Sequence, residues 1–406
     1  MKFKEYDFIP VILGGDITAY SLIRSFYEEY QVKSIAVNMS QGGPVVMSGL
    51  CESIYYEGLE NVDVLIPALM EVGEKYGKDK KLLVLGCGDW YVRILSENKE
   101  TLSKYYIIPY IDPDILNEIV LKDKFYEYME ELNIPYPKTF VYDCKEKTPL
   151  TFDFEYPIIA KTANSAMYHY AKFEGKKKVF CFDNKQQLET MLQNLATSSY
   201  DYKFLIQDRI PGDDTGMRVL TCYCDKNSDV RFAAFGHTLL EEHTPSALGN
   251  PCAIINEVNM EVVDQAQRFL KRVGYVGYAN FDLKYDPRDG KYKFFEINVR
   301  LGRSNYYITG SGFNAVKYLV DEYVYGKQFE GLTVADNEEH LFTFVPKYVI
   351  KKFVKDPELR ARALRLYKQG KWSNPIIYKP DMTTKRRLYV AAYELNQIKK
   401  FNKYYK

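Results

Sequence analysis

Residues 278–300 alternate between polar and apolar side chains on both sides of a short turn sequence. Before the turn, Asn280, Asp282 and Lys284 alternate with apolar residues, and a β-strand places every second side chain on the same face. The turn, residues 286–290, contains a proline that fixes φ and a glycine suited to a left-handed position. The pattern predicts a β-hairpin with one polar and one apolar face. The apolar face must be covered, so the sheet that contains the hairpin is expected to be buried on that side.

The returning strand brings further polar groups to the same face. Its polar residues are Glu296, Asn298 and Arg300, and the apolar face is predicted to take Phe295, Ile297 and Val299. Folding about the turn places Asp282 opposite Phe295 or Glu296, depending on the register. Two carboxylates and an amide oxygen then converge, and Mg²⁺ prefers a few oxygen ligands of this kind. An arginine next to them can hold a phosphate or carboxylate as a bidentate fork. Alternation is also the default of half-exposed strands, so a solvated polar face remains an alternative.

The first hundred residues repeat a different pattern. An apolar run at residues 8–13 ends in Gly14-Gly15-Asp16 and is followed by a helical stretch, and a similar run at residues 81–85 enters another glycine turn and helix. Alternating strands and helices predict a parallel sheet with helices on its faces. Glycines at strand ends fit a ligand crevice, which makes Gly14 and Gly15 candidate substrate contacts. Tight turns require the same glycines, and neither turn completes a dinucleotide fingerprint.

Beyond residue 114 the pattern of predicted helices and strands changes twice along the chain. A second unit begins near Ile115 with a predicted helix at residues 122–132, strands at 157–161 and 204–207 and a helix at 186–195. Residues 218–298 are mainly strands interrupted by a helix at 260–273, and the segment after Gly331 is helical and basic. The predicted domains are therefore residues 1–114, 115–207, 208–330 and 331–406.

Composition excludes several classes of protein. The formal net charge of +1 gives no global field that would attract nucleic acid, so a nucleic-acid partner is not expected. The seven cysteines lack the paired spacings of a zinc site or a disulfide scaffold and are expected to be reduced thiols. The chain shows no signal peptide and no run of about 20 apolar residues, so we expect a cytoplasmic protein without a transmembrane segment.

Several separated motifs resemble one known class of enzymes. Asn280-Phe-Asp282-Leu-Lys284 followed by Phe295-Glu296-Ile-Asn298-Val-Arg300 resembles the metal-binding hairpin of ATP-grasp enzymes, and more narrowly that of bacterial D-aspartate ligases. The narrower resemblance extends over nearly the full chain, through residues 8–10, 109–112, 135–139, 210–214 and 236–237. It implies a multidomain α/β and α+β protein, in which a Rossmann-like N-terminal domain precedes an ATP-grasp fold of two α+β subdomains that clamp ATP.

The resemblance also implies which residues bind the nucleotide and its metal. Asp282, Glu296 and Asn298 would hold Mg²⁺, two ions in this family, for which Mn²⁺ can substitute. Lys124 and Lys161 match the two lysines that neutralise ATP phosphates. The segment Gln207-Asp-Arg-Ile210-Pro-Gly-Asp-Asp214 resembles the hinge between the subdomains, with Gln207 and Ile210 near adenine and Asp214 at the ribose. Asp208 or Asp213 could substitute at the ribose, and the Pro211-Gly212 pair would equally serve a plain turn.

Other positions follow from the same resemblance. Arg300 and Lys161 would steady the phosphoryl group, and Arg303 would bind the amino-acid carboxylate or an acyl phosphate. Arg218 and His237 are expected to face the cleft and contact substrate, although a lone histidine is more often structural. The phosphate loop of the family is rich in small residues, whereas residues 162–178 contain only Gly175 as glycine, so no residue of this loop is assigned.

The implied function is an ATP-dependent ligase. It would activate an amino-acid carboxylate, that of D-aspartate, as an acyl phosphate and join it to an amine such as the lysine side chain of a UDP-linked muramoyl peptide, with ADP and phosphate as the other products. Alternatives that the sequence leaves open are an ATP-grasp dipeptide or natural-product ligase, a nucleotide-binding module without turnover, and a structural α/β protein. The oligomeric state is also left open.

Overall fold

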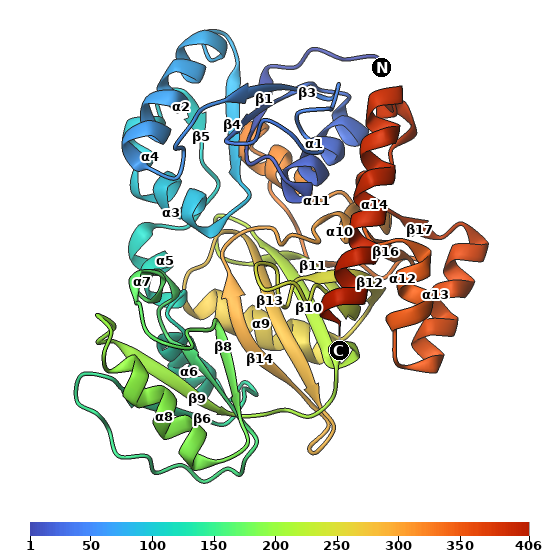
Figure 1. The fold of residues 1–406 in the computed structure, drawn as a ribbon. Coiled ribbons are helices and arrows are strands. Elements are labelled where there is room, and N and C mark those ends of the chain that lie inside the picture. The colour runs from blue at the N-terminus through green and yellow to red at the C-terminus, as the bar shows by residue number, and fades with distance from the viewer. Residues whose placement is uncertain (406) are drawn as a thin grey trace.

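The computed structural model describes residues 1–405, apart from the side chains of residues 165 and 166, and it contains three separate sheets (Figure 1). The first sheet is parallel throughout, with strand order β3-β2-β1-β4-β5. This N-terminal domain consists of β1 (Phe8–Leu13), α1 (Ile17–Tyr30), β2 (Ser34–Asn38), β3 (Cys51–Tyr55), α2 (Val62–Tyr76), β4 (Lys81–Gly86), α3 (Asp89–Glu97), α4 (Lys99–Leu102) and β5 (Tyr106–Ile107). The predicted glycine turn is present, because Gly14 has a φ of 144° and Asp16 caps α1 by accepting from the Thr18 amide at 3.0 Å.

The second sheet is smaller and antiparallel, with order β6-β9-β7-β8. The small domain is reached through α5 (Pro113–Ile119) and α6 (Lys122–Glu131) and consists of β6 (Thr139–Asp143), β7 (Ile158–Thr162), α7 (Ser165–Tyr170), β8 (Val179–Phe182), α8 (Lys185–Leu195) and β9 (Lys203–Asp208). Its buried apolar residues form a cluster of their own within residues 158–206. The small domain, at the lower left of Figure 1, therefore has a core largely of its own, while Ala163 and Leu205 join the apolar cluster that also includes residues of α6.

The third sheet is the largest and runs in the order β14-β13-β10-β11-β12-β16-β17, with β15 paired to β11. Its strands are β10 (Met217–Cys224), β11 (Val230–Glu241), β12 (Pro251–Glu257), β13 (Gly277–Asp286), β14 (Lys291–Asn298), β15 (Thr333–Val334), β16 (Leu341–Thr343) and β17 (Trp372–Ser373). The helices of this core domain are α9 (Met260–Arg272), α10 (Tyr306–Gly310), α11 (Ala315–Leu319), α12 (Lys347–Phe353), α13 (Pro357–Gln369) and α14 (Thr384–Tyr404). Short helical turns lie at η1 (Asp214–Gly216), η2 (Val320–Val324) and η3 (Lys379–Asp381).

The segment after Gly331 is helical and basic as predicted, but it also contributes β15, β16 and β17 to the core sheet. These strands are only two or three residues long, which is too short for a period of two to be visible in the sequence. The four predicted domain boundaries stay a prediction.

The predicted hairpin consists of β13 and β14, and the pairing of these two strands defines its register. Asp282 lies opposite Glu296, and the pairing then shifts so that Leu283 lies opposite Phe294. This irregularity leaves Phe295 as an extra residue, as in a β-bulge. Phe294 therefore joins Ile297 in the buried apolar cluster, while Phe295 lies beneath the ammonium of Lys161, 5.4 Å from its ring centre. The prediction that Phe295 shares the apolar face with Ile297 was wrong, because the bulge reverses the alternation at that point.

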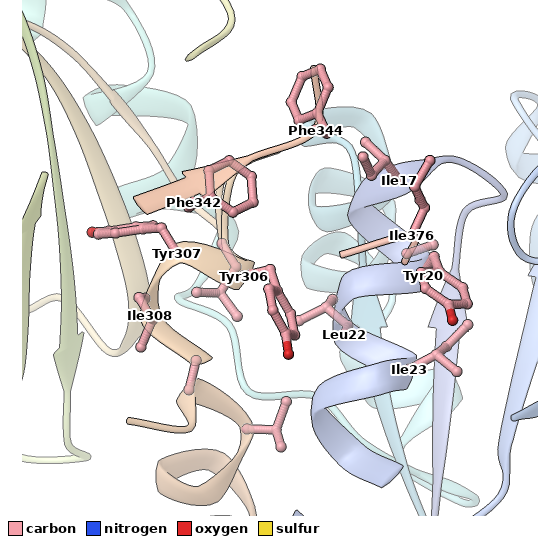
Figure 2. Packing of buried hydrophobic residues seen from close by; sticks show 14 of the residues in the cluster. Ile17, Tyr20, Leu22, Ile23, Tyr306, Tyr307, Ile308, Phe342, Phe344 and Ile376 are labelled. Carbon is pink, nitrogen blue, oxygen red and sulfur yellow. The ribbon is translucent and has the colours of Figure 1, made fainter. Parts of the chain in front are cut away.

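The N-terminal and core domains share one apolar core. Helix α1 packs against α10, α11 and the strand β16, and Figure 2 shows side chains of α1 interleaved with those of α10 and with Phe342, Phe344 and Ile376. The residues of this contact that are at most 3% exposed include Ile17, Tyr20, Leu22, Ile23, Tyr306, Tyr307 and Ile308. Burying each such side chain contributes about 1.5–3 kcal/mol, so separating the two domains would expose a large part of the core.

A buried ion pair fastens the start of α14 to the N-terminal domain. Asp381 and Arg386 are both 0% exposed, with 3.5 Å between the carboxylate and Nε. Asp381 also accepts hydrogen bonds from the hydroxyls of Tyr20 at 2.9 Å and Ser48 at 2.8 Å. The Arg386 guanidinium stacks over the Tyr20 ring at 4.0 Å and donates to the Pro44 carbonyl at 2.6 Å. These contacts join segments more than 300 residues apart in the sequence.

Within residues 1–405, no helix combines the length and the hydrophobicity that crossing a bilayer requires.

We expect Asp381→Asn to destabilise the protein strongly. Removing one partner of a buried ion pair leaves the other charge uncompensated, which costs about 3–5 kcal/mol. Urea denaturation followed by circular dichroism would measure the free energy of unfolding. The matched control is Asp79→Asn, an exposed aspartate for which we expect a change of at most about 0.5 kcal/mol. Equal midpoints for the two variants would contradict the structural role of the pair.

Candidate active site

The polar face of the hairpin carries a compact group of oxygen donors. Strand β10 pairs with β13 so that Val219 lies opposite Asp282, and β14 places Glu296 on the other side of Asp282. Asn298 donates its side-chain Nδ2 to the Asp282 carboxylate at 3.0 Å. The predicted metal ligands Asp282, Glu296 and Asn298 therefore lie together, and the donor bond of Asn298 leaves its amide oxygen available.

The charges around this group are strongly coupled. Lys122 forms an ion pair with Glu296 at 2.8 Å, and its ammonium lowers the pKa of the Glu296 carboxyl. Burial, followed by the negative charge of Glu296, raises the pKa of Asp282. Burial also lowers the pKa of Lys161 to about 8. Two neighbouring carboxylates, only one of which has a cationic partner, form a site where an added cation would be stabilised.

The donor set fits a hard divalent cation. Within residues 1–405, no group of three or more histidine, cysteine, aspartate or glutamate side chains is arranged to hold a metal ion. A cation at the hairpin would rely on two carboxylates and one amide oxygen, and Mg²⁺ is typically bound by few protein ligands together with water and phosphate oxygens. The raised pKa of Asp282 reflects the unfavourable burial of its charge, and a cation would relieve it.

A cavity of about 660 Å³ opens over the hairpin and is lined by all three domains. The core domain contributes the donor group and Arg300 and Arg303, the small domain contributes Lys178, and the N-terminal domain contributes α3. Arg300 forms an ion pair with Asp89 of α3 at 2.9 Å. We call this space the interdomain cavity. Both arginines that were predicted to hold anions line it.

Arg303 connects the interdomain cavity with the N-terminal domain. Its Nη1 lies 2.7 Å from the carboxylate of Asp16, the N-cap of α1, and its Nε lies 3.3 Å from Glu242. A second cavity of about 560 Å³ lies at the carboxyl ends of the parallel strands and is lined by Gly14 and Gly15. Gly88 and Trp90 line both cavities. The glycines that were predicted as substrate contacts therefore adjoin the interdomain cavity without lining it.

The predicted hinge segment, residues 207–214, follows β9 toward the core domain. The Gln207 side chain donates to the Thr139 hydroxyl at 2.7 Å, and the Ile210 carbonyl accepts from Lys284 at 3.1 Å. Asp208 is engaged elsewhere, in an ion pair with Arg288 at 2.6 Å.

Asp214, the predicted ribose acid, is 8% exposed and has defined partners. It accepts from the Glu241 amide at 3.0 Å and lies 3.0 Å from Nε2 of His243, while Tyr405 lies against the His243 ring with 4.4 Å between ring centres. Residues from the end of α14 thus support the hinge.

Of the two predicted phosphate lysines, only Lys161 lies near the donor group. Lys161 is the penultimate residue of β7 and donates to the Tyr126 hydroxyl at 3.3 Å, and its pKa responds to the charges of Glu296 and Asp282. Lys124 is exposed and forms an ion pair with Glu127 at 2.8 Å, pointing away from the interdomain cavity. Lys122, two residues earlier on α6, lines the cavity instead. Helical spacing could have identified Lys122 rather than Lys124 as the inward-facing lysine, because Lys122 lies four residues before the buried Tyr126 and therefore on the same face of α6.

The prediction that Arg218 and His237 face the cleft was wrong. Arg218 pairs with Leu283 and with His237, so all three side chains lie on the face of the sheet opposite to Asp282. On that face both residues bind Glu257, at 4.0 Å from Arg218 and 3.0 Å from His237. Their positions indicate a structural charge cluster.

The sequence interpretation missed four charged residues of the interdomain cavity: Lys122, Asp89, Arg93 and Lys178. Three of them come from α3 and the glycine-poor loop, where the sequence has no regular alternation to indicate a face.

Comparisons with known proteins agree with this arrangement. Residues 239–317 match the family model for the ATP-binding domain of the carbamoyl-phosphate synthase L chain. Over 415 aligned residues, covering 100% of this chain and 98% of the relative, the sequence is 35% identical to the D-aspartate ligase of Enterococcus faecium (strain Aus0004).

Solved structures share the fold. The biotin carboxylase domain of 2-oxoglutarate carboxylase from Hydrogenobacter thermophilus, in complex with MgADP, ADP and bicarbonate, aligns with a TM-score of 0.58 at 13% identity over 80% of this chain and 71% of that chain. The L-amino acid ligase from Bacillus licheniformis aligns with a TM-score of 0.54 at 14% identity over 80% of this chain and 75% of that chain.

The fold and the site together define an ATP-grasp enzyme, which confirms the predicted fold class of a Rossmann-like domain followed by two ATP-clamping α+β subdomains. The protein is an ATP-dependent carboxylate–amine ligase. More narrowly, the identity over the full chain shows that it belongs to the same family as the D-aspartate ligase of E. faecium.

We expect Lys122→Met to weaken MgATP binding while Lys124→Met leaves it unchanged. Lys122 is a cavity-lining cation available to phosphate oxygens, and a charge-assisted hydrogen bond contributes about 1.5–3 kcal/mol, or about 10- to 100-fold in affinity. Titration calorimetry with MgATP would measure both dissociation constants, and thermal unfolding would verify that each variant is folded. A larger loss for Lys124→Met than for Lys122→Met would contradict the assignment.

Proposed function

We propose that the protein activates D-aspartate and joins it to the lysine side chain of a peptidoglycan precursor, a UDP-linked muramoyl peptide. The observation that carries the proposal is the 35% identity to a D-aspartate ligase over essentially the whole length of both proteins. The interdomain cavity supports the proposal, because its basic side chains suit two kinds of anion. Those beside the hairpin suit phosphate, and the arginines beside the N-terminal domain suit a carboxylate.

Bound Mg²⁺, held by Asp282, Glu296 and Asn298, would screen the phosphate oxygens of ATP. The residues around the hairpin position the reactants and stabilise charge, so no covalent enzyme nucleophile is needed. A carboxylate oxygen of the amino acid attacks the γ-phosphorus, and ADP leaves. The amine then attacks the carbonyl carbon of the acyl phosphate, the C–O bond to phosphate breaks, and a proton passes to solvent. We assign Lys161 and Arg300 to the transferred phosphoryl group and Arg303 to the carboxylate or acyl phosphate.

At the nucleotide, we assign Gln207 and Ile210 to the adenine and Asp214 to the ribose. Asp214 is the aspartate at the position of the family's ribose acid, whereas Asp208 forms an ion pair with Arg288. His243 then serves to orient Asp214, and the ring of Tyr405 holds His243 in place. Lys178, exposed on the loop before β8 and lining the interdomain cavity, is available to the phosphates from the small-domain side.

The reaction itself provides the first test. The protein would be incubated with ATP, Mg²⁺, D-aspartate and UDP-muramoyl pentapeptide, and the products analysed by mass spectrometry. We expect a peptide heavier by one aspartyl residue, with one ADP and one phosphate released for each product. L-aspartate, D-alanine and free amines in place of the two substrates would reveal a dipeptide or natural-product ligase. ATP binding without ADP release under all of these conditions would overturn the proposal.

Two aspartates of the same hairpin give a matched pair of variants for this assay. Asp282→Asn removes one charge from the donor group, and we expect turnover to fall by a factor of about 10² or more. Asp289→Asn lies at the exposed turn of the hairpin and should retain nearly full turnover. Full turnover by Asp282→Asn would exclude Asp282 as a metal ligand.

Lys161 predicts a pH dependence of nucleotide binding. In the free protein, burial lowers the pKa of Lys161 to about 8, so the side chain is charged below that pH and loses its proton above it. ATP phosphates favour the charged form and raise this pKa. Binding near pH 8.5 should therefore take up a proton, and affinity should fall as the pH rises above 8. Calorimetry at pH 8.5 in two buffers of different ionisation enthalpy would measure the uptake, which Lys161→Met should abolish. Equal proton uptake by that variant would contradict the assignment.

A further inference from the structure

Five basic side chains line the interdomain cavity, and three of them have acidic partners. Lys122 pairs with Glu296, Arg300 with Asp89, and Arg303 with Asp16 and Glu242. The other two are Arg93 and Lys178, for which residues 1–405 provide no hydrogen bond or ion pair. The cavity therefore offers two cations that have no hydrogen-bonded or ion-paired acid of their own among the described residues.

These two cations occupy opposite walls. Lys178 is exposed on the loop that precedes β8 in the small domain. Arg93 lies on α3, at the edge of the N-terminal domain, between the parallel sheet and α5 (Figure 1). Arg93 is one helical turn, or about 6 Å along the axis, beyond Asp89, whose carboxylate holds Arg300. An anion bound by Arg93 would therefore contact the α3 wall of the cavity, next to the ion pair of Asp89 and Arg300.

The surroundings of Arg93 make water a poor partner for it. Its side chain is half-buried, and the same wall of the cavity is formed by Trp90, Leu116 and Val120. A charge in such a position costs desolvation energy that a ligand of opposite charge would offset. The planar guanidinium favours a carboxylate, which it can hold through two parallel hydrogen bonds.

We propose that Arg93 binds the carboxylate of the amino-acid substrate that is not phosphorylated, and that it thereby selects an amino dicarboxylic acid. The inference rests on the proposed function, because it assumes that an amino acid is activated over the hairpin. One carboxylate reacts beside the donor group and Arg300, and the second reaches the α3 wall. Arg93 touches the substrate without taking part in bond making, so its contribution is to affinity and specificity.

The test compares Arg93→Met with Arg93→Lys and with Arg387→Met, an exposed arginine on α14. Steady-state kinetics of ADP release would be measured while D-aspartate is varied at saturating ATP and acceptor. We expect Arg93→Met to raise KM for D-aspartate by about 10- to 100-fold with kcat changed less than about threefold, and Arg93→Lys to fall between it and the wild type. Arg387→Met should match the wild type. Thermal unfolding would confirm that all variants are folded.

A second measurement separates a carboxylate from a phosphate at Arg93. MgATP dissociation constants would be determined by calorimetry for the same variants, and Arg93→Met should keep the wild-type value within about twofold. A KM for D-aspartate that stays within about twofold of the wild type, or a parallel loss of MgATP affinity, would overturn the assignment.

The outcome for the wild type distinguishes this inference from the proposed function. If the wild type uses D-aspartate and Arg93→Met is unaffected, only the role of Arg93 fails. If the wild type uses another dicarboxylic amino acid, the proposed substrate fails and the same variants test Arg93 with that acid. If only amino acids with a single carboxylate are turned over, both fail.

Discussion

Two carboxylates held side by side on one sheet face, Asp282 and Glu296, are the constraint on which the rest of the site depends. Backbone pairing of β13 with β10 and β14 fixes both of them, so they cannot move apart. Two like charges about 4 Å apart repel by about 4 kcal/mol in a medium typical of a protein surface. Lys122 offsets part of this repulsion from one side and the amide of Asn298 from the other. The remaining imbalance would favour an added cation.

Charge compensation between acidic and basic side chains also determines the positions of the arginines in the outer parts of the cavity. Arg300 and Arg303 are each held by aspartates of the N-terminal domain, Asp89 and Asp16. These acids orient the guanidinium groups and reduce the cost of burying them, while the donors that face the cavity stay available to substrate. The N-terminal domain therefore completes the interdomain cavity electrostatically, although the oxygen donor group lies entirely in the core domain.

The sequence predicted side-chain positions best where the alternation within a single strand determines which face a residue occupies. Strand alternation alone placed Asp282, Glu296 and Asn298 on one face, and the glycine turns of the N-terminal domain were located correctly. The alternation failed at Phe295, because a bulge depends on how two strands pair. It also failed to give the orientation of Arg218 and His237, since the face that a strand presents is set by its neighbours in the sheet. Lys122 and Arg93 lie on helices whose inward face is defined only once other domains pack against them.

The shared apolar core of α1 and α10 determines how substrates can reach the cavity. The N-terminal and core walls cannot separate without exposing that core, and the start of α14 ties them together again through Asp381 and Arg386. The small domain has a core largely of its own and shares only Ala163 and Leu205 with the apolar cluster around α6, so displacing this wall exposes less apolar surface than separating the other two.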